Sequence, residues 1–432
     1  MEATSVGLTR PTVLQLLLRT SFFLRVLVGE LWSVCLGLFR PPGIPTPDPL
    51  SRLVRGICEQ YGGALPKVGQ ILSTRADILP ARLCAALSGL QDDICPIEPA
   101  VVRGLLRREF PHQCFRELDF SPVASATVAQ VHWAVPAHLH NPVALKVLRP
   151  EVERDIRTDT AIAQLFCPLL SAFPKLQGIP IREALTDAQA LLVRQCNVES
   201  EGANLGRLRE AFSDWPTILV PKVHSDLCTQ NVLCMDFIAG MRKLTDPTLP
   251  AEEARDLLVL GLRALYRMIF ELGFIHCDLH PGNLMVAPDG RLVLLDAGLM
   301  VDIDDGTRIA FAQFFASVAL RNGYRAATIV RNTAAHLPDN FDTDAFDQAI
   351  ADWVMDAGGL TARDFQIAAF VGGLFAIQRR FGVRGTSRFT MMILALLVYE
   401  GTAKQLHPDL DFQAAALPFV LASFRHKHPT AI

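Results

Sequence analysis

The sequence predicts an α+β fold of two lobes, a small lobe that contains strands and a larger helical lobe, with a helical extension in front. Three observations predict it. Apolar residues follow strand periodicity over 128–135 and 143–148. Helical periodicity runs through 257–274 and through most of the chain after residue 298. A further helical stretch, 50–110, precedes the strands.

These observations divide the chain into four segments. The predicted segments are an apolar N-terminal helix at 1–40, a proline-rich linker with the helical extension at 41–114, the small lobe at 115–240 and the helical lobe at 241–432.

Composition excludes some functions and suggests a compartment. The net charge is −3 with mixed signs, so no basic footprint for nucleic acid is present. Ten cysteines occur without a C-x-x-C pair, which favours a reducing, intracellular compartment and argues against a disulfide framework or structural zinc. Hydrophobic residues make up 50% of the chain, which prompts a search for membrane contact.

The N-terminal apolar stretch at 11–39 is interrupted by charges. Its longest uncharged piece, Leu31–Phe39, has nine residues, whereas a bilayer span needs about 20. Two interpretations stay open: a helix packed on the protein's own body, or a helix lying on a membrane surface. The second directs four basic residues toward the headgroups: Arg10, Arg19, Arg25 and Arg40.

A proline-rich segment, 41–49, follows and predicts a stiff linker. The helical stretch after it contains Lys67 and Gln70. Taken alone, these two are ordinary solvated helix residues.

The sequence from His276 to Gly298 carries the strongest chemical signal. Asp278 stands five residues before Asn283 and eighteen before Asp296. Phosphoryl transfer from ATP needs one carboxylate near the attacking hydroxyl, and an amide oxygen with a second carboxylate to hold Mg²⁺. An H-x-D-x-x-x-x-N loop followed by D-x-G supplies these groups, so the sequence predicts a protein-kinase-like fold with an ATP and Mg²⁺ site.

A zinc site is the neighbouring interpretation, because His276 and His280 are four residues apart. Pro281 and Gly282 follow at once, and no glutamate follows His276 as H-E-x-x-H requires. We therefore expect His276 to orient the loop through hydrogen bonds.

The predicted small lobe supplies the remaining nucleotide-binding candidates. Lys146 ends a Val-Ala-Leu-Lys strand, a near match to the kinase strand whose lysine contacts the α/β-phosphates. Glu199 and Glu201 are both candidates for the glutamate that holds it. The strand at 231–238 ends at an expected hinge, which adds Asp236 and Ile238. Small residues stand where a kinase has a glycine-rich loop: Ala124, Ser125, Ala126 and Thr127.

Four features together resemble the UbiB/AarF/ADCK atypical kinase family. They are the Lys67-Val68-Gly69-Gln70 helix, the alanine-rich loop with its following strand, the Lys146 strand, and the His276–Asn283 loop with Asp296-Ala297-Gly298. Together they span residues 50–300. The family is associated with ubiquinone and other isoprenoid-quinone lipids.

The resemblance implies roles by position. Lys146 would contact the phosphates of ATP and pair with Glu201, which matches the family glutamate in Glu201-Gly202-Ala203-Asn204. Asp278 would be the catalytic aspartate, with Asn283 and Asp296 on Mg²⁺. Lys67 and Gln70 would lie over the nucleotide.

That arrangement implies a small or lipid-like substrate, or ATP hydrolysis coupled to lipid extraction, rather than protein phosphorylation. A lipid-biosynthetic complex is the implied partner. The implied location is peripheral, on the cytoplasmic or mitochondrial matrix face of a membrane.

The sequence departs from the family pattern at three places. Gln195 and Asn197 replace the acids of an E-x-D motif, so the ion pair expected for Lys67 is lost. Ala297 replaces the phenylalanine of D-F-G. The transmembrane hairpin of many bacterial relatives is not found, so membrane attachment would rest on the N-terminal helix.

Two other functions stay open at this point. An aminoglycoside- or choline-kinase-type phosphotransferase also carries the H-x-D-x-x-x-x-N loop. A catalytically silent nucleotide-binding scaffold would fit the lost E-x-D acids.

Overall fold

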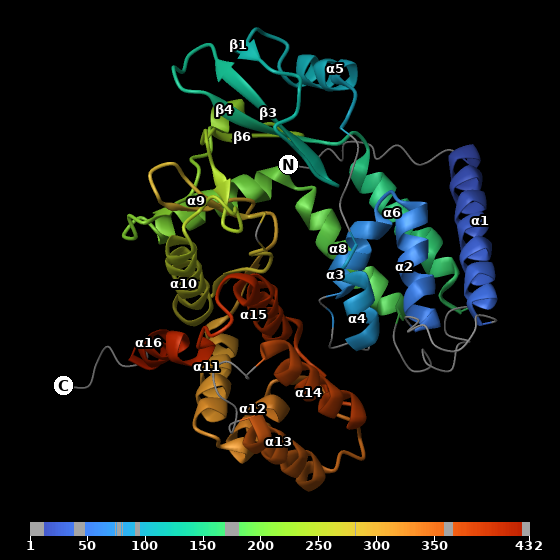
Figure 1. The fold of residues 1–432 in the computed structure, drawn as a ribbon, viewed down its shortest axis with the longest axis vertical. Helices are drawn as coiled ribbons and strands as arrows, with labels where there is room; N and C mark the ends of the chain where they lie inside the picture. The colour runs from blue at the N-terminus through green and yellow to red at the C-terminus, as the bar shows by residue number, and fades with distance from the viewer. Residues whose placement is uncertain are drawn as a thin grey trace, which may run out of the picture. The chain divides into compact units, whose positions relative to one another are not determined.

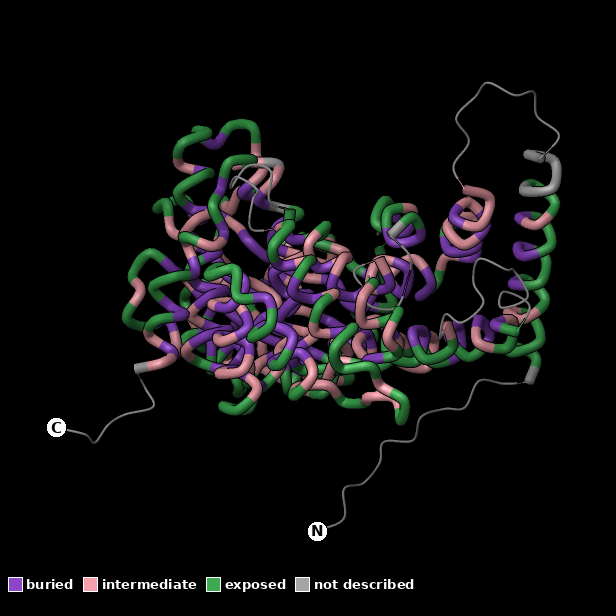
Figure 2. Tube along the Cα trace, turned by 90° about the horizontal axis from the view of Figure 1, so that it is seen from below, coloured by how far each residue is buried: buried purple, intermediate pink, exposed green. Residues whose placement is uncertain are grey.

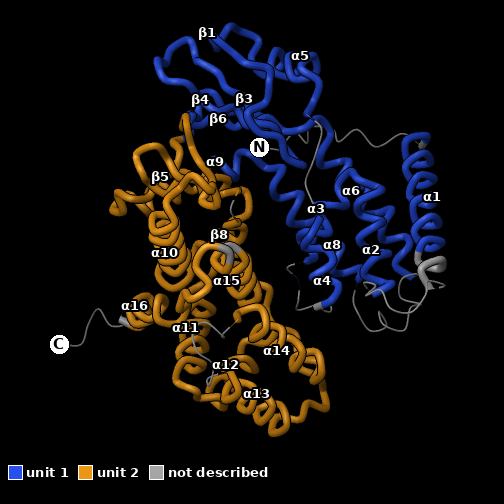
Figure 3. The backbone as a smooth tube through the Cα atoms, in the orientation of Figure 1, with its two compact units in different colours: residues 1–202, 223–237 blue, residues 203–222, 238–432 orange. Residues whose placement is uncertain are grey.

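The computed structural model describes residues 13–38, 48–73, 75, 79, 81–90, 96–168, 181–280, 282–357 and 366–425. Their contacts form two units (Figure 3). Unit 1 takes the chain up to Gly202 and adds Val223–Phe237, and unit 2 takes Ala203–Lys222 and the chain from Ile238 on. The four segments predicted from the sequence remain a prediction.

The strands predicted before residue 150 are confirmed and lie inside an antiparallel sheet of unit 1 (Figure 1). The strand order is β1-β3-β4-β6, and β2 also pairs with β3. Lys146 on β4 lies between Val131 of β3 and Leu233 of β6, so its strand is hydrogen-bonded on both sides. The strands are β1 (Phe115–Leu118), β2 (Ala124–Ser125), β3 (Ala129–Pro136), β4 (Val143–Leu148) and β6 (Val232–Asp236).

Alternation along β4 gives this sheet two different faces. Leu145 and Val147 point to one face and are fully buried, packed with α5 (Pro99–Glu109) and neighbouring strands. Lys146 therefore belongs to the opposite face. The apolar core on one side of the sheet fixes the direction of the lysine on the other.

A second core in unit 1 is built from helices alone. The helical prediction for 50–110 is confirmed as four separate helices. The linker prolines up to residue 47 lie outside the described residues, and Pro49 begins α2, where its missing N–H costs no hydrogen bond. The helices of this core are α1 (Val13–Leu38), α2 (Pro49–Tyr61), α3 (Leu65–Ser73), α4 (Ala81–Leu87), α6 (Val152–Leu165) and α8 (Ile181–Gln195).

Helix α1 packs on its own unit and leaves an apolar side exposed (Figure 2, right-hand edge). Phe23, Val26 and Leu27 are buried in or beside the helical core. The helix thus packs on the protein's own body, as the first interpretation expects. Its exposed apolar side leaves the second interpretation, contact with a membrane surface, open. No described helix has the length and apolar composition to cross a membrane. The exposed apolar residues of α1 are Leu14, Leu16, Leu17, Leu18, Phe22, Leu24, Val28 and Trp32.

The prediction that Arg19 points toward headgroups is wrong. Its Nη1 donates to Asp159 Oδ1 at 2.8 Å, and its Nη2 lies 3.0 Å from Asp155 Oδ2, both on α6. Burial raises the pKa of the Asp159 carboxyl, and Arg19 opposes that rise. A buried carboxylate is stabilised by such a cation, so we expect Arg19 to stay paired with α6. Arg25 is exposed, and the other two arginines, Arg10 and Arg40, lie outside the described residues.

The chain from 181 to 211 forms two helices. α8 ends at Gln195, and α9 (Val198–Ala211) begins after Asn197. The Asn197 Oδ1 accepts from the Ser200 N–H at 2.9 Å, which caps the new helix and stops the old one.

A hairpin in unit 2 turns at Pro288-Asp289-Gly290. β9 (Leu284–Val286) and β10 (Leu292–Leu294) pair antiparallel, and Gly290 takes a φ of 84° in the turn. Their sheet has the order β5-β10-β9-β7, so β5 (Ile218–Leu219) is an edge strand, which agrees with the nearby Pro221 because a proline has no N–H for a further strand. The other edge is β7 (Arg242–Lys243).

The predicted apolar helix before the loop is α10 (Ala251–Arg267), extended by a π-helical turn at Met268–Leu272. β8 (Phe274–His276) follows directly. A Cβ at Gly261 would lie 2.4 Å from Tyr399 Oη, so this glycine allows a later helix to pack closely on α10.

The helical prediction for most of the chain after residue 298 is confirmed. The carboxylate of Glu400 on α15 is buried and caps α14. It accepts from the N–H groups of Ile367 and Ala368 at 2.7 and 2.8 Å. The helices are α11 (Asp305–Ala319), α12 (Gly323–Asn332), α13 (Thr343–Ala357), α14 (Ile367–Arg380), α15 (Ser387–Leu406) and α16 (Phe412–Arg425), with short strands β11 (Met300–Asp302), β12 (Ala334–His336) and β13 (Arg384–Gly385).

Candidate functional site

In unit 1, Lys146 and Glu201 form an ion pair. The lysine Nζ donates to both carboxylate oxygens, at 2.6 and 2.8 Å. The two side chains are 13% and 1% exposed. Of the two candidate glutamates, Glu201 is therefore the partner of Lys146, and Glu199 is exposed to solvent.

Two local features put Glu201 in reach of the sheet. Asn197 starts α9, so Glu201 lies in its first turn, where the helix dipole favours a carboxylate. Gly202 comes next, and a Cβ there would lie 3.1 Å from Leu233 Cδ1 on β6. Asn197 therefore caps the helix that carries Glu201, as the family's aspartate at this position could also do.

Arg149 holds the alanine-rich loop, and the sequence prediction missed it. Its Nη2 donates to Ser125 Oγ and its Nε donates to Ala126 O, both at 2.8 Å. Its backbone N–H donates to Val128 O at 2.9 Å. The sequence signal for Arg149 is its position alone, three residues after Lys146. A planar guanidinium with several donors fixes the loop in a way that alanine side chains alone cannot.

We expect Arg149→Ala to weaken nucleotide binding about tenfold, or about 1.4 kcal/mol, because the loop loses two charge-assisted hydrogen bonds. Titration calorimetry with Mg-ADP measures this. Arg149→Lys keeps the charge without the fork and should give an intermediate affinity. Unchanged affinity in Arg149→Ala would show that the loop conformation does not depend on this contact.

The loop also contains a buried hydroxyl that suits an anionic ligand. Within the described part of the chain, Thr127 Oγ1 is buried and has no hydrogen-bond partner. Such orphaned groups are rare in native proteins, and a hydroxyl can donate to a phosphate oxygen. Together with the neighbouring Lys146 strand, these residues fit a phosphate-bearing cofactor.

Among the further nucleotide candidates of unit 1, Gln70 and Asp236 form hydrogen bonds with other residues. Gln70 Nε2 donates to Leu90 O at 2.9 Å, and Lys67 is half-buried on the same helix, α3. Asp236 ends β6, where its Oδ1 lies 2.9 Å from His224 Nε2. Their roles toward a nucleotide stay predictions, as does that of the half-buried Ile238 in unit 2.

In unit 2, His276 orients the loop that carries Asp278. The Asp278 N–H donates to His276 Nδ1 at 3.1 Å, so the ring proton sits on Nε2, which faces Leu295 O at 3.4 Å. The ring is fully buried, and burial lowers its pKa, which keeps the imidazole neutral. Both nitrogens are engaged, so His276 offers no lone pair to a zinc ion.

Asn283 and Asp296 are tied to the same loop. The Asn283 Nδ2 donates to Asp278 O at 2.9 Å, and the amide oxygen, Oδ1, takes no part in this contact. The Leu295 N–H donates to Asn283 O at 3.0 Å, immediately before Asp296. A carboxylate and an amide oxygen are ligands that Mg²⁺ prefers, so the two residues fit this ion.

Asp296 has an unusual backbone for a non-glycine residue, with a φ of 51°. The Gly298 N–H donates to its Oδ1 at 3.1 Å, and Asn204 Nδ2 donates to Ala297 O at 2.9 Å. Ala297 is fully buried. Strained conformations of this kind persist where surrounding contacts enforce them and are frequent at functional sites.

Comparison with known proteins decides the family. The family model described as "ABC1 atypical kinase-like domain" matches residues 89–330. The model described as "UbiB helical domain" matches residues 350–411. The chain belongs to the UbiB-type ABC1 atypical kinase-like family. The predicted resemblance and the predicted kinase-like fold are both confirmed.

Relatives of this UbiB-type chain align over most of its length. The "Probable protein kinase UbiB" of Erwinia tasmaniensis is 28% identical over 90% of this chain and 73% of its own. The protein of the same name from Marinobacter nauticus is 30% identical over 89% of this chain and 71% of its own. An uncharacterized protein of Synechocystis is 30% identical over 72% of this chain and 80% of its own.

A solved structure shares the fold of this family member. The structure titled as the complex of Rv3197 with erythromycin, from Mycobacterium tuberculosis, superposes with a TM-score of 0.54 at 18% identity. It covers 81% of this chain and 90% of that one.

Proposed function

We propose that this UbiB-type chain binds Mg-ATP and acts as an atypical kinase or ATPase that supports the biosynthesis of ubiquinone or a related isoprenoid lipid. The buried Lys146–Glu201 ion pair carries the proposal, because a lysine desolvated in this way and held by two hydrogen bonds is prepared for phosphate oxygens. The names of its UbiB relatives support the link to ubiquinone.

The proposed chemistry is positioning and charge stabilisation. Lys146 would donate to the α/β-phosphates, and Asn283 Oδ1 with an Asp296 carboxylate oxygen would hold the metal. Magnesium, when bound, neutralises charge on the phosphates. Asp278 would orient the attacking hydroxyl or water and accept its proton, on a loop fixed by His276.

The acceptor in this proposal is a small or lipid-like molecule or water, and the implied protein partner is a lipid-biosynthetic complex. Phosphate release from ATP by the purified full chain tests the catalytic part, with and without lipid vesicles. Magnesium-dependent release that needs no protein acceptor is expected. Nucleotide binding without any release would favour the silent scaffold instead.

We further propose that the exposed apolar side of α1 rests on a membrane surface. The exposed charge among its described residues is Arg25, and its acidic residue, Glu30, is buried. An apolar stripe with a basic residue and a tryptophan is typical of helices that lie in the interface.

Replacing Leu17 and Leu18 with serine should weaken binding of the full chain to anionic vesicles at least tenfold, since each buried leucine contributes about 1.5–3 kcal/mol. Vesicle sedimentation measures this. Leu320→Ser, at an exposed site on unit 2, is the control and should bind like wild type. Equal binding of the double variant would contradict the proposal.

A further inference from the structure

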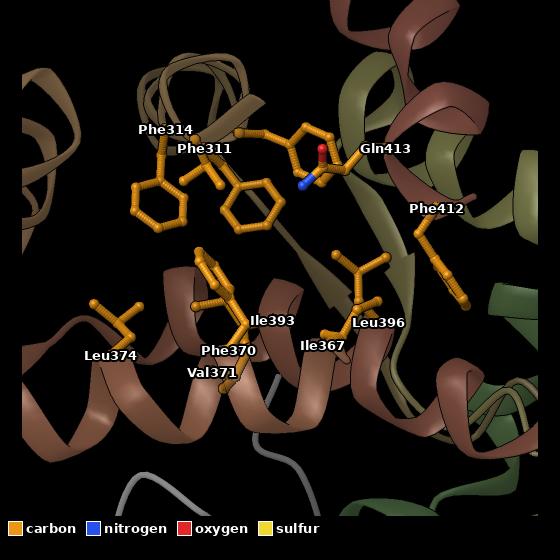
Figure 4. A pocket seen from close by; sticks show the side chains of 12 residues that line it. Phe311, Phe314, Ile367, Phe370, Val371, Leu374, Ile393, Leu396, Phe412 and Gln413 are labelled. Atoms are coloured by element: carbon orange, nitrogen blue, oxygen red, sulfur yellow. The ribbon is translucent and has the colours of Figure 1, made fainter. Parts of the chain in front are cut away.

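The helices of the two units are held together in different ways. In unit 2, α11, α14, α15 and α16 meet mainly through apolar side chains, and the cavity between them is about 50 Å³, far smaller than a ligand pocket of roughly 300–1,000 Å³ (Figure 4). In unit 1, α1, α2, α3 and α6 meet at a buried charge, the carboxylate of Asp159. The proposed phosphoryl chemistry does not use this charge.

The carboxylate of Asp159 is on α6 and is 3% exposed. Its Oδ1 accepts from Arg19 Nη1 of α1 and from Tyr61 Oη of α2, both at 2.8 Å. Its Oδ2 accepts from the Ala64 N–H at 3.1 Å, directly before α3 begins. One carboxylate therefore joins α1, α2 and the start of α3 to α6.

The turn between α2 and α3 is shaped around this carboxylate. Gly62 and Gly63 have φ values of 68° and 57°, which glycine adopts without strain. A Cβ at Gly63 would lie 2.6 Å from Asp159 Oδ2, so a larger residue would push the carboxylate away. The free N–H groups and the dipole at the start of α3 favour a negative charge there. We therefore expect the start of α3 to depend on the charge of Asp159.

Helix α1 supplies a cation for this carboxylate. Burial raises the pKa of the Asp159 carboxyl, and the Ala64 N–H and the charge of Arg19 oppose that rise. The rings of Phe22 and Phe23 on α1 also pack on Tyr61, with centroids 5.7 and 5.4 Å from its ring. Release of α1 would thus leave a buried carboxylate without its arginine and would uncover the tyrosine that binds it.

We propose that Asp159 is a conformational link, through which the docking of α1 holds the turn that begins α3 in place. Coupling of this kind is reciprocal, so loosening the turn also releases α1. Helix α3 carries Lys67 and Gln70. An effect of α1 on nucleotide binding would rest on the proposed function, whereas the link between the two helices does not.

The test is hydrogen exchange of the full chain without nucleotide, measured by mass spectrometry. Arg19→Gln should speed exchange about tenfold in α1 and in residues 62–70, because local opening becomes easier when the carboxylate loses its cation. Strand β4 belongs to the other core of unit 1 and should keep its wild-type rates. Arg25→Gln, at an exposed position of the same helix, is the matched control and should exchange like wild type.

Gly63→Ala perturbs the link from its other end. The added methyl group displaces the Asp159 carboxylate, so exchange should rise several-fold in α1 as well as in the turn. Gly104→Ala, on α5, is the control because a Cβ there has no neighbouring atom within 4 Å. Wild-type exchange of α1 in Gly63→Ala would contradict the reciprocity that the link requires.

A rescue variant separates the charge from a general loss of packing. Asp159→Asn in the Arg19→Gln background removes the unpaired charge and keeps the side-chain shape, so protection of residues 62–70 should partly return. Three results would overturn the proposal: faster exchange confined to α1 in Arg19→Gln, equal acceleration of β4, or no recovery with the second substitution.

Discussion

Asp278→Asn should lower the rate of ATP turnover by a factor of about 10²–10⁴, the usual contribution of a positioned general base. The asparagine keeps the shape of the side chain but cannot accept a proton. The aspartate carboxylate lies 3.8 Å from His280 Nε2, while the loop is held through the Asp278 backbone. The fold and nucleotide affinity should therefore be unchanged.

Phosphate release under saturating Mg-ATP measures this effect, with melting temperature and Mg-ADP affinity as checks on the same samples. Asp339→Asn, at an exposed position, is the matched control and should turn over like wild type. Full activity in Asp278→Asn would assign the proton acceptor elsewhere.

Lys146→Ala should lower the free energy of unfolding by about 3–5 kcal/mol, because it leaves the carboxylate of Glu201 buried without its cation. That glutamate is 1% exposed, so water cannot replace the lysine. Urea denaturation measures the loss. Turnover should vanish as well, but the stability effect is expected even without nucleotide.

A second substitution separates the ion pair from other effects. Glu201→Gln in the Lys146→Ala background removes the stranded charge and should recover part of the lost stability. Lys243→Ala, at an exposed lysine on β7, should change stability by less than about 0.5 kcal/mol. A loss below about 1 kcal/mol in Lys146→Ala would mean that Glu201 is not desolvated.

Elements defined by local patterns could be predicted from the sequence. Alternation placed Lys146 on a strand, and the spacing of Asp278, Asn283 and Asp296 predicted a kinase-like loop followed by D-x-G. Each of these features depends on residues close together in the chain. The helix before the loop was predictable for the same reason.

Contacts between distant residues could not be predicted. Arg149 reaches back 23 residues to Ala126, and Arg19 meets Asp159 across 140 residues. Neither arginine differs in its local pattern from a solvent-exposed one. Only the folded core of unit 1 brings α1 beside α6, so the sequence could not exclude Arg19 from a membrane surface.

Asn197 shows a third kind of limit. A family pattern marks it as a missing acid, which suggests lost function. The structure shows that the same residue caps α9 and so positions Glu201. The hydrogen bonds of a residue that departs from a family motif should therefore be known before the departure is interpreted as a loss of function.

The most direct measurement is the melting temperature of the full chain with ADP, with and without Mg²⁺, for wild type and Asp296→Asn. A ligand at 100 times its Kd stabilises the native state by about 2.7 kcal/mol, so wild type should melt several degrees higher with Mg-ADP. Asp296→Asn should lose the Mg²⁺-dependent part of that rise. An unchanged melting temperature in wild type at saturating Mg-ADP and Mg-ATP would contradict the proposed nucleotide site.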